Sequence, residues 1–241
     1  MLEYRSPLTA HLSGFGDLGA GDKNLIQEAV GKRVRIAAAH SDIVCEGDSP
    51  RWVKVVLEGW AMRYKQLPDG RRQVLALMLP GDICDANAFI HQHMDHSICA
   101  LTTVRYAEVS QADFEALLTA SPRLTRALWW SELVTLSIQR EWTTNIGQRQ
   151  AYERIAHLFC EVFARLQAIG LTQGESCEFP LTQTDIADAT GLTPVHVNRM
   201  VQALRHDGLI ELRDKRLHLR DAAKLRHVAM FTPAYLHLSR I

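Results

Sequence analysis

The sequence predicts an α+β protein with three parts: an N-terminal antiparallel β-barrel of the jelly-roll, cupin-like type, a long helix, and a C-terminal winged helix-turn-helix domain. Three observations predict this architecture. Short segments rich in β-branched and apolar residues alternate with turn sequences before residue 110. A stretch without Gly or Pro follows Pro122, and two closely spaced helix starts follow residue 180.

The composition is that of a globular protein, since 47% of the residues are hydrophobic and 22% are charged. At 241 residues the chain is long enough for about two domains with their own cores. The sequence has no apolar run of the length of a membrane span, and its first segment, MLEYRSPLTAHL, lacks a signal-peptide core. We therefore expect a cytoplasmic protein with no membrane partner.

The formal net charge is zero, which by itself does not indicate a nucleic-acid partner. The charge is unevenly distributed, however. Residues 181–241 hold 9 Lys and Arg against 6 Asp and Glu, together with five of the eleven histidines. This mildly basic C-terminal end is consistent with local contacts to phosphates.

Residues 1–120 are predicted to form the β-barrel with short flanking helices. A helical lead-in over residues 7–30 is interrupted by the glycine-rich segment GFGDLGAGD. Hairpin turns are expected at residues 68–70 and 81–82. Ser110 and Asp113 form a capping box for a brief helix after the last strand. The strand segments are RVRIAAA, WVKVVLEGWAMRYKQ, RQVLALML and RYAEVS.

A long helix is predicted over residues 121–147, because Pro122 suits a first helical position and no further Gly or Pro occurs before Gly147. Seven residues on it repeat at alternating steps of four and three, the spacing of a helix pair across a dimer axis. The alternative is burial of this stripe against the chain's own barrel. The predicted dimer seam consists of Leu124, Leu128, Ile138 and Trp142, with Ser131, Thr135 and Asn145 completing the stripe.

The segment TQTDIADATGLTPVHVNRMVQAL has the two helix starts of a helix-turn-helix. Thr182 and Asp185 form a capping box for a first short helix, which must end in a left-handed turn at Gly191. Thr193 then caps a second helix whose first position is Pro194. This order of caps and turn predicts two helices packed at a corner.

The second helix of this pair has two faces. Val197, Val201 and Leu204 are spaced to face inward. Side chains of the outward stripe can bond base edges in a major groove, Arg to guanine and Asn or Gln to adenine. The alternative is an ordinary helix corner with a solvated polar face. The predicted base-reading residues are Val195, Asn198, Arg199 and Gln202.

The C-terminal domain is predicted to span residues 148–241, after a hinge at 147–152 and with a first helix over 153–169. After the helix pair, LIELRDKRLHL predicts two short strands joined by a charged turn, which is a wing. Asp221 is placed to cap a last helix.

The cysteine pattern gives no support to a metal cluster. Five cysteines are widely spaced without a CxxC pair, so we expect neither a zinc ribbon nor an iron–sulfur cluster, and most should be reduced core thiols. The segment HQHMDH places three imidazoles together, which are candidate metal or haem ligands or, alternatively, a solvated loop. The cysteines are Cys45, Cys84, Cys99, Cys160 and Cys177, and the histidines are His91, His93 and His96.

Two other functions compete with DNA binding. A cupin-type metal-binding enzyme would use the HxH pattern of the barrel, but it would leave the helix-turn-helix unexplained. A regulatory module without DNA binding would leave the outward stripe unexplained. We therefore expect a DNA-binding protein and not an enzyme.

The order of β-barrel, long helix, hinge and winged helix-turn-helix resembles the Crp/Fnr family of bacterial transcription regulators over nearly the whole chain. The most specific segments are PDGRRQVLALMLPGD at 68–82, SPRLTRAL at 121–128 and LTQTDIADATGLTPVHVNRMVQALRHDGLIEL at 181–212. The resemblance implies a homodimer that binds a palindromic operator, contacts RNA polymerase and responds to a signal in its sensor barrel.

The resemblance also implies roles on double-stranded DNA. Arg199 matches the position at which the family reads guanine. Pro194 and Val195 replace the family's Arg-Glu or Val-Glu, so an acceptor for cytosine N4 is missing and the operator is expected to differ. The residues that match phosphate contacts of the family are Thr182, Gln183, Thr184, Thr193, His196 and Lys215.

In the sensor, the sequence departs from the cyclic AMP branch of the family. Ala86 replaces the Glu that binds the ribose, and His96 replaces the Arg that binds the phosphate. Cyclic AMP would lose its strongest contacts, so we do not expect it to be the effector. The oxygen-sensing branch needs a cysteine cluster near the N-terminus, whereas the first cysteine here is Cys45. The predicted pocket for an unidentified small-molecule effector consists of Ala86, His96, Ser97, Gln139 and Arg140.

Overall fold

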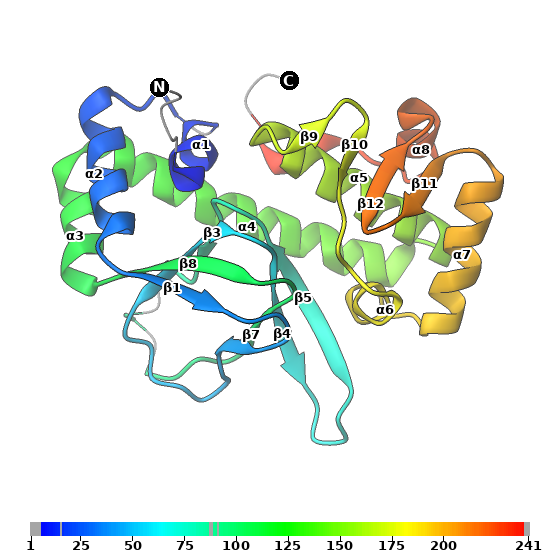
Figure 1. The fold of residues 1–241 in the computed structure, drawn as a ribbon, viewed down its shortest axis with the longest axis horizontal. Helices are drawn as coiled ribbons and strands as arrows, with labels where there is room; N and C mark the ends of the chain where they lie inside the picture. Colours follow the sequence, from blue (N-terminus) through cyan, green and yellow to red (C-terminus); the bar gives the residue numbers. More distant parts are fainter. Residues whose placement is uncertain (1–5, 15, 87–88, 91, 239–241) are drawn as a thin grey trace. The chain divides into compact units, whose positions relative to one another are not determined.

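The computed structural model describes residues 6–14, 16–86, 89–90 and 92–238, and it confirms the predicted α+β fold class (Figure 1). The chain forms two compact units. Unit 1 comprises residues 1–65 and 76–135, and unit 2 comprises residues 66–75 and 136–241. The helices are α1 (Pro7–Ser13), α2 (Ala20–Gly31), α3 (Gln111–Ala120), α4 (Pro122–Gln148), α5 (Ala151–Ala168), α6 (Gln183–Thr190), α7 (Pro194–His206), α8 (Ala222–Val228) and the 3₁₀ helix η1 (Pro233–Leu236).

Two four-stranded antiparallel sheets make up the β-domain, and they form a jelly-roll-like sandwich. The predicted jelly roll is thus confirmed, but it is an open sandwich and not a closed barrel, because the described strands pair only within their own sheet. In spatial order the first sheet contains β1 (Val34–Ala37), β8 (Val104–Val109), β3 (Val53–Glu58) and β6 (Ile83–Cys84). The second contains β2 (Asp42–Val44), β7 (Ser97–Ala100), β4 (Ala61–Gln66) and β5 (Arg72–Met78).

The alternation of side chains along β3 divides the core of unit 1 into two layers. Val56 joins Ala61 and Ile98 in the apolar layer between the two sheets. Val53 and Val55 belong to a second layer, in which the first sheet packs against α1, α2, α3 and the first turns of α4. The helical lead-in predicted from the sequence is therefore part of this core and not a loose extension.

In unit 2, α5 is the central element, and it contacts α6, α7, α8 and η1. The predicted wing is confirmed as β11 (Ile210–Arg213) and β12 (Arg216–Leu219). A second hairpin, β9 (Thr172–Gln173) and β10 (Ser176–Glu178), extends the wing sheet in the order β11-β12-β10-β9. Sequence analysis missed this hairpin, because strands of two and three residues are too short to show an alternating pattern.

The stripe predicted as the dimer seam on α4 is buried within its own chain, so that prediction is corrected. Leu124 and Leu128 lie in the helical layer of unit 1, and Ile138 and Trp142 are 8% and 6% exposed. The stripe is thus buried against its own chain, which was the alternative interpretation of its spacing. A helix on the surface of a protein buries one apolar face in the core, and in α4 this stripe is that face. The large apolar side chains that α4 exposes are Trp129, Trp130, Leu133, Leu136 and Ile146.

A buried carboxylate holds three segments of unit 2 together. Glu161 on α5 is completely shielded from solvent. Its oxygens accept hydrogen bonds from Trp142 Nε1 on α4, at 2.9 and 3.1 Å, and from the Tyr235 hydroxyl on η1, at 2.7 Å. Burial raises the pKa of Glu161, although the guanidinium of Arg165 opposes the shift. Glu161 therefore binds its proton more tightly in the folded protein than in the unfolded chain.

This raised pKa predicts that the free energy of unfolding of Glu161→Gln, relative to that of the wild type, increases as pH rises. A folded-state pKa above the unfolded value, which is about 4.3, means that folded protein binds more protons between the two values. The free energy of unfolding of the wild type falls over that window, whereas Gln stays neutral. Urea unfolding at pH 5, 6.5 and 8 measures the difference, with exposed Glu115→Gln as control. A stability difference that does not grow with pH would contradict the assignment.

Candidate nucleic-acid interface

The helix pair α6–α7 has the caps that the sequence predicts. Thr182 Oγ1 accepts from the Asp185 backbone N–H at 3.1 Å, and Asp185 Oδ2 accepts from the Thr182 N–H at 3.0 Å. Gly191 ends α6 in the left-handed region with φ 64°, where a residue with a Cβ would be strained. Thr193 Oγ1 accepts from the His196 N–H at the start of α7. These local bonds fix where each helix begins and ends.

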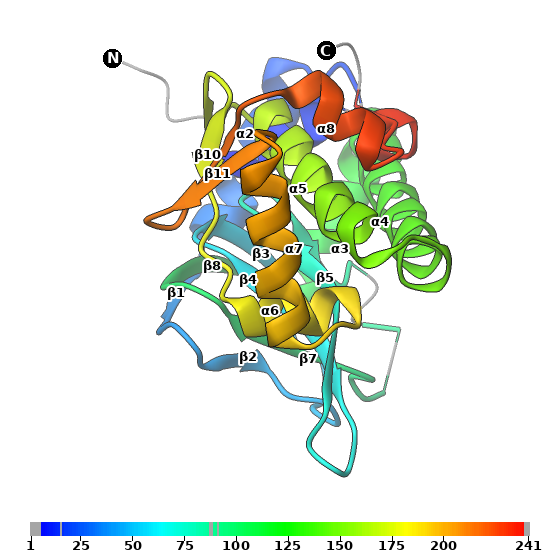
Figure 2. The same ribbon diagram turned by 90° about the vertical axis from the view of Figure 1, so that its right-hand side faces the viewer.

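The structure places the predicted base-reading residues together on the solvent side of α7, and we call Val195, Asn198, Arg199 and Gln202 the recognition face. Val195 is 73% exposed, Arg199 and Gln202 are exposed, and Asn198 is half-buried. On the opposite side Val197 and Leu204 are fully buried. Figure 2 looks onto α7, with α6 crossing near its N-terminal end. The outward stripe that the spacing predicts is therefore accessible over its length.

The predicted phosphate contacts lie at three places in unit 2, the N-termini of α6 and α7 and the turn of the wing. Thr182, Gln183 and Thr184 are exposed at the N-terminus of α6, where free amide groups favour an anion. Lys215 is exposed in the two-residue turn between β11 and β12, in which Asp214 and Lys215 have φ values of 50° and 57°. Both values are positive, as in the tight turns that match the twist of hairpin strands. At the N-terminus of α7, Thr193 is exposed and His196 is half-buried.

The residues predicted for the effector pocket do not form one cluster. Ala86, His96 and Ser97 belong to unit 1, whereas Gln139 and Arg140 belong to unit 2. Each polar member is hydrogen-bonded within its own unit. Ser97 Oγ accepts from the Glu46 N–H, Gln139 Nε2 donates to the Leu75 carbonyl, and Arg140 Nη2 donates to Ser137 Oγ.

His96 is the centre of a charged network that the sequence did not reveal. Its Nδ1 lies 2.7 Å from Asp95 Oδ1 and its Nε2 lies 3.1 Å from Asp85 Oδ2, while Arg63 Nη2 donates to Asp85 Oδ1 at 2.9 Å. Burial opposes ionisation of Asp85, but the hydrogen bond to His96 and the charge of Arg63 hold its pKa below the usual range. Burial raises the pKa of Glu132. The charge of Asp85 raises it as well, whereas the charge of Arg63 lowers it. The Arg63 guanidinium is thus already paired with the Asp85 carboxylate.

A cavity of about 390 Å³ lies in unit 1 beside this network. Asp85 and Cys84 of the β6 end contribute to its wall, but none of the five residues predicted for the effector pocket does. Burial raises the pKa of the Cys84 thiol to about 12, so the thiol is neutral. Both positive and negative groups line the cavity, together with apolar and aromatic surface from Trp52, Met94 and Ile98; the charged groups are Asp48, Arg51, Lys54 and Asp85.

The histidine cluster gives no metal site in the described part of the chain. His91 lies outside the described residues, so its predicted role is not addressed by the structure. His93 Nδ1 is 3.2 Å from the Gly47 carbonyl oxygen, and His96 contacts two carboxylates. Among the described residues there is no group of three or more His, Cys, Asp or Glu placed to hold a metal ion.

All five cysteines are free thiols, and four of them are buried, as the spacing predicts. Burial raises the pKa values of Cys160 and Cys177 to about 12. Cys45 is the exposed one. Within the described residues, none of the helices has the combination of length and apolar character that a bilayer crossing requires.

Two family models match separate parts of the chain. The Crp-like helix-turn-helix domain matches residues 153–228, which contain the recognition face. The cyclic nucleotide-binding domain matches residues 34–121, which contain the two sheets of unit 1 and the cavity. These matches agree with the architecture of a β-sandwich followed by a DNA-binding helix pair.

Similar proteins of known role are regulators. The transcriptional activator protein FnrL of Cereibacter sphaeroides is 31% identical over 188 residues, which are 77% of this chain and 75% of FnrL. The nitrogen fixation regulation protein FixK of Bradyrhizobium diazoefficiens is 30% identical over 202 residues, 84% of each chain. The structure of FixK2 from Bradyrhizobium japonicum shares the fold, with a TM-score of 0.74 at 24% identity over 83% of this chain and 98% of FixK2. On this identity and coverage, the chain belongs to the Crp/Fnr family of transcription regulators and is not an enzyme.

Proposed function

We propose that this regulator binds a palindromic operator as a homodimer, with α7 of each protomer in a major groove. The observation that carries the proposal is the recognition face, four side chains exposed or half-buried on one side of α7, the second of two capped helices. A helix of this kind fits the major groove, and a two-fold dimer presents two of them about one helical turn apart. Such a regulator works in the cytoplasm, where its DNA is.

Arg199 is the residue proposed to read a guanine. Its guanidinium can donate two hydrogen bonds to O6 and N7, whereas Asn198 and Gln202 offer both donors and acceptors. Val195 presents an apolar surface that suits a thymine methyl group. Because Pro194 and Val195 supply no acceptor for cytosine N4, the half-site is proposed to differ from sites that require that contact.

The phosphate contacts are proposed to position the helix without selecting a sequence. Gln183 and Thr184 offer amide, hydroxyl and backbone N–H donors at the α6 N-terminus, and the Thr193 hydroxyl and the His196 imidazole lie at the start of α7. Thr182, which donates its N–H and hydroxyl to Asp185, would have to exchange one of these bonds for a phosphate. Lys215 would contribute a positive charge from the wing turn on the other flank. RNA polymerase is the further partner that the family relationship supports.

The dimer is proposed to form through the exposed apolar face of α4. Trp129, Leu133 and Leu136 follow one another at steps of four and three, and they are 64%, 48% and 53% exposed. Side chains at this spacing lie along one side of a helix and suit a parallel helix pair. This seam replaces the buried stripe that the sequence suggested.

The signal is proposed to be a small molecule in the cavity of unit 1, and not cyclic AMP. Arg63, a half-buried cation next to the cavity wall, is engaged by Asp85, and Asp85 itself lines the cavity. The Asp85 carboxylate would repel a cyclic phosphate in the cavity. Arg63 is already paired with Asp85 and so would not supply the permanent positive charge that binds such a phosphate.

Leu136→Asp is predicted to shift the protein from dimer to monomer at micromolar concentration, because it places two carboxylates in the apolar seam. Sedimentation velocity measures the change. Ala116→Asp, at an exposed position of α3, is the matched control and should remain dimeric. Ile138→Asp should unfold the protein instead, since Ile138 is buried in its own chain. A folded Leu136→Asp protein that remains fully dimeric would place the seam elsewhere.

Calorimetric titration with cyclic AMP is predicted to give no saturable heat at micromolar concentrations, for the electrostatic reason given above. The control is a titration under the same conditions with a Crp/Fnr protein that binds cyclic AMP. Saturation at one site per chain would show that other residues replace the missing ribose and phosphate contacts.

Selection of bound duplexes from a random pool is predicted to return a palindrome, and two variants then separate base reading from positioning. Arg199→Ala should cost about 1–3 kcal/mol on the selected site and relax one guanine preference per half-site. Lys215→Ala should weaken matched and scrambled duplexes alike and lower the salt slope by about one unit. Binding titrations at several salt concentrations measure both. Equal losses on both duplexes for Arg199→Ala would assign Arg199 to the DNA backbone.

A further inference from the structure

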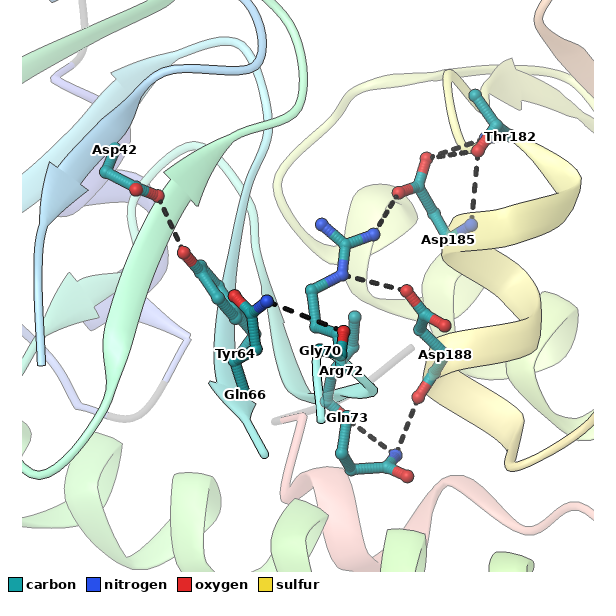
Figure 3. A network of polar contacts seen from close by, with 10 residues as sticks. Asp42, Tyr64, Gln66, Gly70, Arg72, Gln73, Thr182, Asp185 and Asp188 are labelled. Atoms are coloured by element: carbon teal, nitrogen blue, oxygen red, sulfur yellow. Dashed lines mark hydrogen bonds and ion pairs between the residues drawn. The ribbon is translucent and has the colours of Figure 1, made fainter. Parts of the chain in front are cut away.

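The tip of the β4–β5 hairpin, residues 66–75, belongs to the same compact unit as the helix-turn-helix. The turn is closed by the Leu67 N–H donating to the Arg71 carbonyl at 2.8 Å and by Gly70, whose φ is 88°. Figure 3 shows two side chains of the tip, Arg72 and Gln73, pointing toward α6. The tip therefore contacts the first helix of the DNA-binding pair.

Three hydrogen bonds join the tip to α6. Arg72 Nε donates to Asp188 Oδ2 at 2.8 Å, and Arg72 Nη2 donates to Asp185 Oδ1 at 3.1 Å. Gln73 Nε2 donates to the Asp188 carbonyl oxygen at 2.7 Å. Asp185 and Asp188 are three residues apart, so one guanidinium spans one turn of the helix.

This contact is more sheltered than an ordinary surface ion pair. The side chains of Arg72, Asp185 and Asp188 are 26%, 9% and 23% exposed. In contrast, Arg71 next to it is 76% exposed and pairs with Asp69 inside the turn. Exposed pairs contribute little to stability, whereas a sheltered bidentate pair is stronger and has a defined geometry.

Arg72 also bonds the carboxylate that caps α6. Asp185 Oδ1 accepts a hydrogen bond from Arg72 Nη2, while Asp185 Oδ2 accepts from the Thr182 N–H and hydroxyl. Thr182, Gln183 and Thr184 nevertheless remain exposed. The hairpin thus holds α6 from one side and leaves uncovered the end that is proposed to meet phosphates.

The charges explain why the contact matters for DNA. Asp185 and Asp188 place two negative charges within about one Debye length, 8–10 Å, of the phosphate-binding end of α6. Without Arg72 they would repel the phosphate backbone and leave the capping carboxylate without its cation. Arg72 therefore contacts two positions along α6 and offsets one of these two negative charges.

We infer that Arg72 is a positioning residue for operator binding, through its contact with Asp185 and Asp188 of α6. The inference rests on the proposed function, because it concerns affinity for the operator. Arg72 acts through α6 and does not itself contact DNA.

The test compares Arg72→Ala with Arg71→Ala, its neighbour outside the contact, in the full-length protein. Hydrogen exchange of the α6 amides is measured without DNA, and affinity for the selected operator is measured by fluorescence anisotropy. Arg72→Ala should speed α6 exchange and lower operator affinity on the order of tenfold, the scale of a hydrogen bond to a charged group. Arg71→Ala should leave both values unchanged.

A charge exchange supplies the second arm of the test. Arg72→Asp alone should weaken binding more than Arg72→Ala, and adding Asp188→Arg should restore most of the loss. The single Asp188→Arg variant completes the double-mutant cycle and accounts for its added positive charge. Rescue would exclude a direct contact between Arg72 and DNA, which an Asp at position 72 could not make.

The outcomes separate this inference from the proposed function. Wild-type protein that selects no duplex would overturn operator binding. If the wild type binds, then unchanged affinity, increased affinity, or a loss without faster α6 exchange and without rescue would each overturn the role of Arg72. In every case the exchange measurement tests the ion pair itself, because it does not need DNA.

Discussion

The structure depends on one helix, α4, which is 27 residues long and has to serve two apolar faces. Its inward face contributes Leu124 to the helical layer of unit 1 and Trp142 to the buried contact with Glu161 in unit 2. Its other face exposes Trp129, Leu133 and Leu136. Because helical hydrogen bonds resist bending, the positions of both faces are coupled along the helix axis.

The elements that sequence analysis predicted well are those whose physical requirements are local. Thr182, Gly191 and Thr193 each satisfy a backbone group or a backbone conformation within four residues, so their roles are visible in the sequence itself. The seam on α4 failed for the opposite reason. The buried stripe through Leu124 and the exposed stripe through Leu133 have the same spacing of fours and threes, and spacing alone does not show which stripe the chain covers.

The recognition face could be predicted because a single helix carries it, and helical periodicity assigns its side. The cavity network and the hairpin contact could not, because they join residues that are distant in sequence. Arg63 meets Asp85 across 22 positions, and Arg72 meets Asp188 across 116. Asp85 also has a φ of 59°, a left-handed conformation that Asp tolerates better than most residues but that its presence in a sequence does not predict. Burial, which raises the pKa of Glu132, and the contacts with His96 and Arg63, which lower the pKa of Asp85, likewise follow only from the folded chain.

The segment after α8 packs on α5, although the helix-turn-helix match ends before it. The helix-turn-helix match ends at residue 228, yet Phe231 and Tyr235 lie against the His157 ring at centroid distances of 5.3 and 6.0 Å, and Tyr235 bonds Glu161. Burial and the charge of Arg149 lower the pKa of His157 to about 3. A fragment excised at the boundary of the match would admit water to this neutral imidazole and take one donor from a buried carboxyl group. The C-terminal module of this chain therefore includes η1.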